Sequence, residues 1–350
     1  MRVHWFLPTA GDGRDIVAGG QAGSAVVSER PPDLAYLSVL AKAVERLGFD
    51  GVLTPTGTFC EDAWLTTAAL LPQTSTLRFL VAFRPGLISP TLAAQMAATY
   101  QRLSGGRLML NVVTGGDSAE QRRFGDHLDH DLRYARTAEF LQVLRGAWSG
   151  TPYSFRGDFY DVEAATVREA PDPVPAVFFG GSSEPALRVA AEHADTYLTW
   201  GEPLAEVAAK LDRVRALANR PPAFGIRLHV IARDTAAEAW QAARDLLARV
   251  PESAVDAARE RFARSESVGQ QRMSALTGGE SLEIAPNLWA GYGLVRPGAG
   301  TALVGSHTEV AARIAEYAAL GIDHVILSGQ PHLEEAYRFG EGVLPLLRTR

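Results

Sequence analysis

Two cationic residues stand two positions apart in an apolar, strand-like segment, and they are the strongest chemical signal in this sequence. The segment reads FGIRLHV at 224–230 and holds Arg227 and His229. Side chains along a β-strand alternate between its two faces, so both cations would project from the same face. If that face points into a barrel, the pair would receive an anion, because a guanidinium keeps its proton and offers a fork of donors. On a solvated edge strand the same two residues would have no function.

Other strand-like segments also end in polar or aromatic residues. These further candidates are Cys60, Asn111, Thr114, Ser182, Ser183, Trp200 and His332. Their number favours a shared site over chance placement. The turn with Ser182 and Ser183 is rich in glycine and precedes a predicted helix, where backbone N–H groups could bind the phosphate of a mononucleotide. Helix capping by serine explains the same pattern equally well.

Short strand-like segments alternate with longer helical patterns along the chain, which is typical of parallel βα units. The predicted strands are residues 3–8, 51–54, 77–83, 107–114, 176–179, 196–200, 224–231 and 324–328, with a hairpin inserted at 153–162. This cadence predicts a closed (β/α)₈ TIM barrel, an α/β fold, in one domain that spans residues 1–350. The carboxyl ends of the strands converge on one face of such a barrel, so the candidate residues would meet there.

One long segment, residues 250–305, interrupts the cadence before the last βα unit. A stretch of this length without barrel strands predicts an insertion that acts as a mobile lid or a partner surface, or that is disordered. Arg296 stands in its glycine-rich part, between Gly293 and Gly298. We therefore expect a hinged loop that carries a positive charge, and the alternative is a flexible loop in which Arg296 is merely solvated.

Composition narrows the classes of function. The chain has 350 residues with 34 basic and 40 acidic side chains, and it lacks the basic stripe that nucleic-acid binding would need. No apolar run approaches the ~20 residues that span a bilayer, so we expect no membrane segment. A single cysteine, Cys60, indicates a reducing compartment and a cytoplasmic protein. The Asp and His residues at 117–131 have irregular spacing, which favours a solvated loop over a metal site.

Several segments together resemble a known family. They are residues 5–9, 56–57, 60–64, 179–183, 197–203, 225–230 and 287–291. With these segments the chain is similar, from residue 3 to residue 347, to the FMNH2-dependent alkanesulfonate monooxygenases. That group belongs to the bacterial-luciferase-like flavin monooxygenases, whose fold is a TIM barrel of the kind predicted above.

The resemblance implies a two-component enzyme. Reduced FMN would come from a separate NAD(P)H-dependent FMN reductase and react with O2, and a sulfonate would be oxygenated and split into sulfite and an aldehyde. By resemblance the flavin is bound by Asn111, Thr114, Tyr134, Ser182 and Ser183, with Cys60 nearby, and the sulfonate by Trp200, Arg227, His229, Arg296, Gln330 and His332. Arg227, His229, Arg296 and His332 would be catalytic. The resemblance further implies a homodimer or homotetramer and a non-prolyl cis peptide near Val81-Ala82.

The chain departs from the family at Gln330, where a tyrosine is common. An amide with both a donor and an acceptor replaces a phenol there, so a more polar sulfonate, such as a sugar sulfonate of the sulfoquinovose type, is an alternative to a simple alkanesulfonate. The loop at 16–30 could also reshape the mouth of the site. Two further alternatives are an F420-dependent oxidoreductase of the same superfamily and a flavin-binding protein without turnover. The family's anion-binding residues argue against both.

Overall fold

Eight parallel strands close into a barrel, which confirms the predicted fold. The computed structural model describes residues 1–17 and 29–348, so most of the loop expected at 16–30 lies outside the described residues. The barrel strands are β1 (Arg2–Phe6), β2 (Gly51–Thr54), β3 (Arg78–Phe83), β4 (Leu108–Val112), β7 (Val177–Gly180), β8 (Thr196–Trp200), β9 (Ala223–Arg233) and β13 (Ile322–Ser328). Each strand pairs with the next in this order, and β9 and β1 both pair with β13, which closes the ring.

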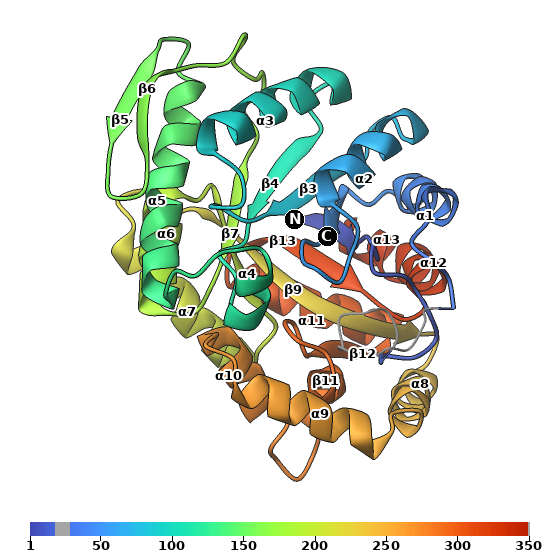
Figure 1. Ribbon diagram of the computed structural model, residues 1–350. Coiled ribbons are helices and arrows are strands. Elements are labelled where there is room, and N and C mark those ends of the chain that lie inside the picture. The colour runs from blue at the N-terminus through green and yellow to red at the C-terminus, as the bar shows by residue number, and fades with distance from the viewer. Residues whose placement is uncertain (18–28, 349–350) are drawn as a thin grey trace.

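Helices surround the strands (Figure 1). They are α1 (Leu34–Leu47), α2 (Ala63–Leu70), α3 (Pro90–Ser104), α4 (Ser118–Arg123), α5 (His130–Ala147), α6 (Glu184–His193), α7 (Leu204–Leu217), α8 (Ala236–Ala248), α9 (Glu252–Ala263), α10 (Val268–Ala275), α11 (His307–Ala319), α12 (His332–Gly342) and α13 (Leu344–Arg348), with 3₁₀ turns η1 (Leu71–Gln73) and η2 (Gly291–Leu294). Their ends follow local chemistry. For α1, the Asp33 side chain accepts the N–H of Tyr36, and Gly48 ends the helix with a φ of 90°.

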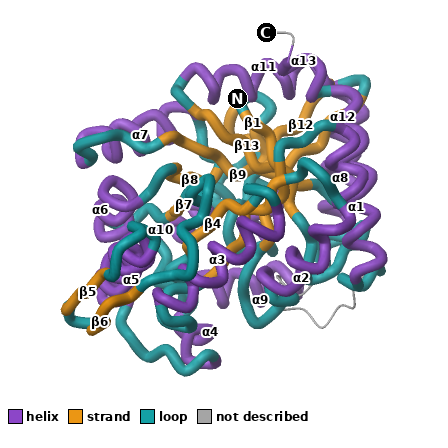
Figure 2. Tube along the Cα trace, turned by 90° about the horizontal axis from the view of Figure 1, so that it is seen from above, coloured by secondary structure: helices purple, strands orange, loops and turns teal. Residues whose placement is uncertain are grey.

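The predicted hairpin is present as β5 (Tyr153–Arg156) and β6 (Asp161–Ala165), which pair antiparallel. It lies beside α5 and outside the barrel (Figures 1 and 2). The expected cis peptide at Val81-Ala82 is wrong, because the described cis bonds are Asp172-Pro173 and Gln330-Pro331. Val81 and Ala82 instead continue the regular ladder between β3 and β4.

Residues 250–305 contain more regular structure than their sequence indicates. Besides α9, α10 and η2 they form β10 (Glu283–Ala285), β11 (Leu288–Trp289) and most of β12 (Ala302–Ser306). β12 pairs in parallel with the second half of β9, from His229 onward, just past the point where β8 ends opposite Arg227. The segment therefore adds no strand to the closed barrel, but it does extend the sheet along β9.

The apolar core has two layers. Inside the barrel, one cluster comprises Leu53, Leu80, Met109, Phe178 and Ile326. A larger cluster fills the space between the strands and the surrounding helices. Because successive side chains of a strand alternate between these layers, the interior positions at the carboxyl ends of the strands are the ones left to face a site.

The requirements of a membrane span and of a metal site are both unmet among the helices and side chains of residues 1–17 and 29–348. None of the helices in residues 1–17 and 29–348 is long and apolar enough to cross a membrane. The same residues contain no group of three or more His, Cys, Asp or Glu side chains placed to hold a metal ion. In the 117–131 region, the Asp117 side chain caps α4 and Asp126 pairs with Arg136.

Candidate cofactor and substrate site

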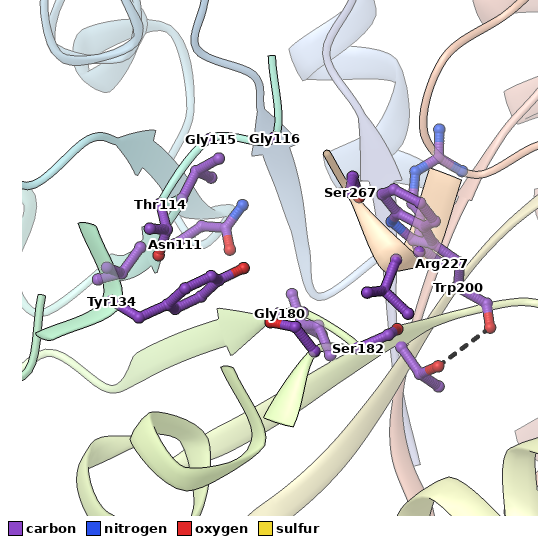
Figure 3. Close-up of a pocket in the computed structure, with 18 of the residues that line it drawn as sticks. Asn111, Thr114, Gly115, Gly116, Tyr134, Gly180, Ser182, Trp200, Arg227 and Ser267 are labelled. Carbon is purple, nitrogen blue, oxygen red and sulfur yellow. Dashed lines mark hydrogen bonds between the residues drawn. The ribbon is translucent and has the colours of Figure 1, made fainter. Parts of the chain in front are cut away.

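A cavity of about 230 Å³ opens at the carboxyl ends of the barrel strands. Seven of the predicted site residues line it, namely Asn111, Thr114, Tyr134, Ser182, Ser183, Trp200 and Arg227. In Figure 3, Asn111, Thr114 and Tyr134 stand on one side of the cavity and Trp200 and Arg227 on the other, with Gly180 and Ser182 between them. The cavity thus joins the residues expected to bind a flavin to two of those expected to bind a sulfonate.

The serine turn before α6 has the features of a phosphate site. Ser183 is the N-cap residue of α6, but its side chain makes no capping hydrogen bond. Its hydroxyl and that of Thr114 are buried and make no hydrogen bond of good geometry among the described residues, although the Ser183 hydroxyl is near enough to Tyr134 to act on the pKa of that phenol. Because a helix N-terminus and a buried hydroxyl without a partner both favour a bound anion, the capping alternative does not explain this turn.

Glycine at position 181 lets the turn pack closely. A Cβ there would lie 2.5 Å from the Cβ of Ala186 and 3.2 Å from the hydroxyl oxygen of Tyr134. The hydroxyl of Tyr197 donates to the carbonyl oxygen of Gly181 at 2.7 Å. These contacts place the Tyr134 hydroxyl and the α6 N-terminus at the same end of the cavity.

On the other side, a chain of hydrogen bonds joins Arg227 to His229. Arg227 donates to the Ser328 hydroxyl at 2.6 Å and to the carbonyl of Leu228. Ser328 lies 2.7 Å from Nδ1 of His229, whose Nε2 lies 3.0 Å from the carbonyl of Ala299. A carbonyl can only accept, so we assign the proton of His229 to Nε2, and Nδ1 accepts from Ser328. Both ring nitrogens are therefore occupied, and the ring also stacks on Tyr292 at 3.8 Å.

Two arginine and two histidine side chains gather around this chain of hydrogen bonds. His229, Arg296 and His332 are buried, and Arg227, which lines the cavity, is half-buried. Burial and nearby Arg296 lower the pKa of Arg227 to about 9. Burial and the neighbouring arginines lower the pKa of His229 well below its ordinary value. Burial is also the main cause that lowers the pKa of His332 to about 4.

The burial of Arg296 distinguishes between the two alternatives that the sequence left open for this residue, a charge carried by a hinged loop and a merely solvated side chain. The residue is 6% exposed, so the alternative of a merely solvated arginine is wrong. A backbone N–H of His332 donates to the Asp12 carboxylate at 2.9 Å, and the charge of Asp12 acts on both Arg296 and His332. By contrast, no carboxylate among the described residues forms an ion pair with Arg227.

Residues 1–324 match the profile of the family described as luciferase-like monooxygenase. The chain belongs to the luciferase-like monooxygenase family. Among solved structures, a riboflavin lyase with modified FMN and riboflavin is 21% identical, with a TM-score of 0.83 over 100% of this chain and 92% of the other. The EDTA monooxygenase of Chelativorans sp. BNC1 is 19% identical, with a TM-score of 0.75 over 100% of this chain and 94% of the other. An F420-dependent secondary alcohol dehydrogenase is 17% identical, with a TM-score of 0.70 over 99% of each chain. At these identities the likeness is one of fold.

Five predicted residues of this luciferase-like monooxygenase do not line the cavity: Cys60, His229, Arg296, Gln330 and His332. His229 adjoins it through Ser328, whereas Gln330 is buried with its amide oxygen unpartnered among the described residues. Cys60 is half-buried, and burial raises the pKa of its thiol to about 11. Burial therefore favours the protonated thiol at neutral pH, the less nucleophilic form.

Other lining residues were not predicted from the sequence. They include His130, Gly115, Gly116, Thr199 and the residues Ser267, Val268 and Gly269. His130 lies against Tyr134, with ring centroids 4.9 Å apart. Ser267 caps α10, and this capping serine predicts a helix start but not that the helix reaches the cavity.

Proposed function

We propose that this protein is an FMNH2-dependent monooxygenase that oxygenates an organosulfonate and cleaves its carbon–sulfur bond. The observation that carries the proposal is Arg227, a half-buried guanidinium without a carboxylate partner among the described residues, in the wall of a cavity whose other end suits a phosphate. A buried charge without a partner is costly. A sulfonate remains an anion at physiological pH and would supply the missing negative charge.

The residues of the cavity fit FMN. The phosphate would meet Ser182, Ser183, the α6 N-terminus and the Tyr134 hydroxyl, and the ring would lie toward Asn111 and Thr114. The unpartnered hydroxyls of Thr114 and Ser183 are donors that such a ligand would satisfy. When bound, reduced FMN supplies the two electrons that activate O2.

The overall reaction balances for a primary sulfonate. RCH2SO3⁻, O2 and FMNH2 give RCHO, SO3²⁻, FMN, H2O and H⁺; the flavin is oxidised, one oxygen atom enters the aldehyde and the other leaves in water. Arg227 would hold the sulfonate oxygens, and Ser328 would keep the guanidinium oriented. Since both nitrogens of His229 are occupied, its part in this proposal is to fix Ser328 and contribute to the anion pocket.

Water must be kept from the reacting groups. We propose that residues 250–305 serve this purpose, with Arg296 completing the anion pocket beside Arg227. An Arg296→Ala variant would then oxidise FMNH2 without a matching release of sulfite while its fold stays intact. Coupling equal to that of the wild type would remove the lid from the proposal.

The first test is sulfite release in air-saturated buffer with FMN, NADH and a generic flavin reductase, over a panel from methanesulfonate through octanesulfonate to sulfoquinovose. Sulfite that depends on both FMNH2 and O2 supports the proposal. FMNH2 binding without sulfite from any panel member contradicts it. Within the panel, preference for sulfoquinovose would support the sugar-sulfonate alternative that Gln330 raises, and a Gln330→Tyr variant should then shift preference toward octanesulfonate.

The choice of cofactor and the assembly of the protein can be tested separately. Titration with FMN and with F420 separates the monooxygenase from an F420-dependent oxidoreductase. We propose a separate NAD(P)H-dependent FMN reductase as the source of FMNH2, a homodimer or homotetramer, and a cytoplasmic location. Sedimentation with and without the reductase tests the assembly.

A further inference from the structure

Helix α10 contacts both halves of the candidate site. Its first turn and N-cap, Ser267 to Gly269, form part of the cavity wall. Gly269 packs on the indole of Trp200, since a Cβ there would lie 2.9 Å from the ring. One residue further on, the side-chain oxygen of Gln270 accepts the N–H of Gly298 at 2.9 Å, two residues past Arg296. The position of α10 therefore sets the cavity wall and the backbone beside Arg296 together.

A buried carboxylate fastens α10 to the barrel. Arg272 of α10 donates two hydrogen bonds to Glu202, from Nε at 2.8 Å and from Nη2 at 2.7 Å. Glu202 stands two residues past Trp200, and its side chain is 2% exposed. Lys210 also binds this carboxylate at 3.1 Å and donates to the hydroxyl of Thr199, a cavity residue, at 2.9 Å. A carboxylate fixed in this way offers the planar guanidinium a rigid partner.

We infer that Glu202 and Arg272 are positioning residues, which dock α10 and thereby hold the cofactor cavity and the Arg296 loop in their binding arrangement. Neither residue is assigned to contact the flavin or the sulfonate. Their effect passes through Gly269, which supports Trp200, and through Gln270, which holds Gly298. The identity of the ligands rests on the proposed function, whereas the docking of α10 does not.

The two partners differ as targets for mutation. Removing Glu202 would leave Lys210 buried without its counter-charge, which destabilises a fold in general. Removing Arg272, whose side chain is 41% exposed, leaves the Glu202–Lys210 pair intact. Arg272→Gln is thus the cleaner variant, and Arg272→Lys restores the charge but not the fork.

The matched control is Arg145→Gln. Arg145 is 37% exposed and pairs at 3.0 Å with Asp195, the residue before β8, at the opposite end of the strand that leads to Glu202. Each purified variant is compared by thermal unfolding, by hydrogen exchange of residues 265–276 and 296–300, and by FMN affinity from quenching of flavin fluorescence.

For Arg272→Gln we expect exchange in both segments to rise and the Kd for FMN to rise roughly 10- to 100-fold, as loss of a charge-assisted hydrogen-bond pair implies. Exchange elsewhere and the unfolding temperature should match the control, and Arg272→Lys should recover part of the affinity. The inference is overturned if Arg272→Gln shows the same hydrogen exchange and the same FMN affinity as Arg145→Gln. It is also overturned if exchange in Arg272→Gln rises over the whole chain, because the ion pair would then serve only the stability of the fold. Failure of the proposed function gives a different result from failure of this inference. In that case the wild type itself does not bind FMN or release sulfite, and the comparison of hydrogen exchange still tests whether Arg272 docks α10.

Discussion

Replacing Arg227 by methionine should stabilise the ligand-free protein, although this residue lies at the centre of the proposed anion pocket. Burial and Arg296 lower its pKa to about 9, against an ordinary guanidinium value of roughly 12.5. At about 1.4 kcal/mol for each pKa unit, the charged form costs at most about 5 kcal/mol in the fold. The cost is fully present at every pH below 9. Methionine keeps most of the apolar contacts, so after relaxation we expect a gain of roughly 1–2 kcal/mol in unfolding free energy.

Urea denaturation at pH 7.5 measures this gain, and Arg107→Met is the matched control. Arg107 is a partly buried arginine whose donors are satisfied, by Ser104 at 2.7 Å, by Thr74 at 2.9 Å and by Leu71 at 3.1 Å. Its replacement should lower the unfolding free energy by roughly 2–4 kcal/mol, because three acceptors lose their donor. The two substitutions are chemically identical and neither arginine pairs with a carboxylate among the described residues, so opposite signs would point to the desolvation of Arg227 and its fewer hydrogen bonds as the cause.

A bound anion should raise the unfolding free energy of the wild type relative to that of Arg227→Met. With methanesulfonate at ten times its Kd, the wild type gains about 1.4 kcal/mol from linkage, whereas Arg227→Met gains nothing. The reasoning fails if Arg227→Met loses more than about 1 kcal/mol without ligand, since burial of the charge would then not be destabilising. It also fails if the variant is still stabilised by methanesulfonate.

Three further outcomes follow from particular side chains. Ser183→Ala should weaken FMN binding about tenfold in fluorescence titration and leave riboflavin binding unchanged, because riboflavin lacks the phosphate that the unpartnered hydroxyl would meet. At the amino end of the barrel, Nε2 of His4 lies 2.9 Å from Nδ1 of His324. Burial lowers the pKa of His324 to about 4. The unfolded chain takes up protons first, so the unfolding free energy should fall as pH drops from about 6.5 to 4, and His324→Gln should flatten this dependence in urea titrations at several pH values. Cys60, with its raised thiol pKa of about 11, should react with iodoacetamide at pH 8 at least about tenfold more slowly than free cysteine.

Local signals in the sequence were sufficient for the barrel and for residues on both sides of its cavity. Each barrel strand is a short apolar run followed by turn residues, so the strands and the residues at their carboxyl ends could be placed without knowledge of distant contacts. Arg227, Ser183 and Asn111 were found in this way. The contribution of Gly269 could not be, because it depends on contact with Trp200, a residue 69 positions earlier in the chain.

The glycines near Arg296 show why a local pattern can have two interpretations. Their density predicts a flexible hinge, yet the N–H of Gly293 donates to the carbonyl of Gly300 at 2.8 Å. A Cβ on Gly300 would lie 2.7 Å from the Cα of Gly293, so these two backbones pass closer than any side chain allows. Glycine serves two opposite purposes, conformational freedom and close approach, and the sequence alone does not distinguish them. Arg296 is buried beside these glycines, and the carbonyl of Ala299 lies against His229, so at this point the glycines shape the wall of the proposed anion pocket.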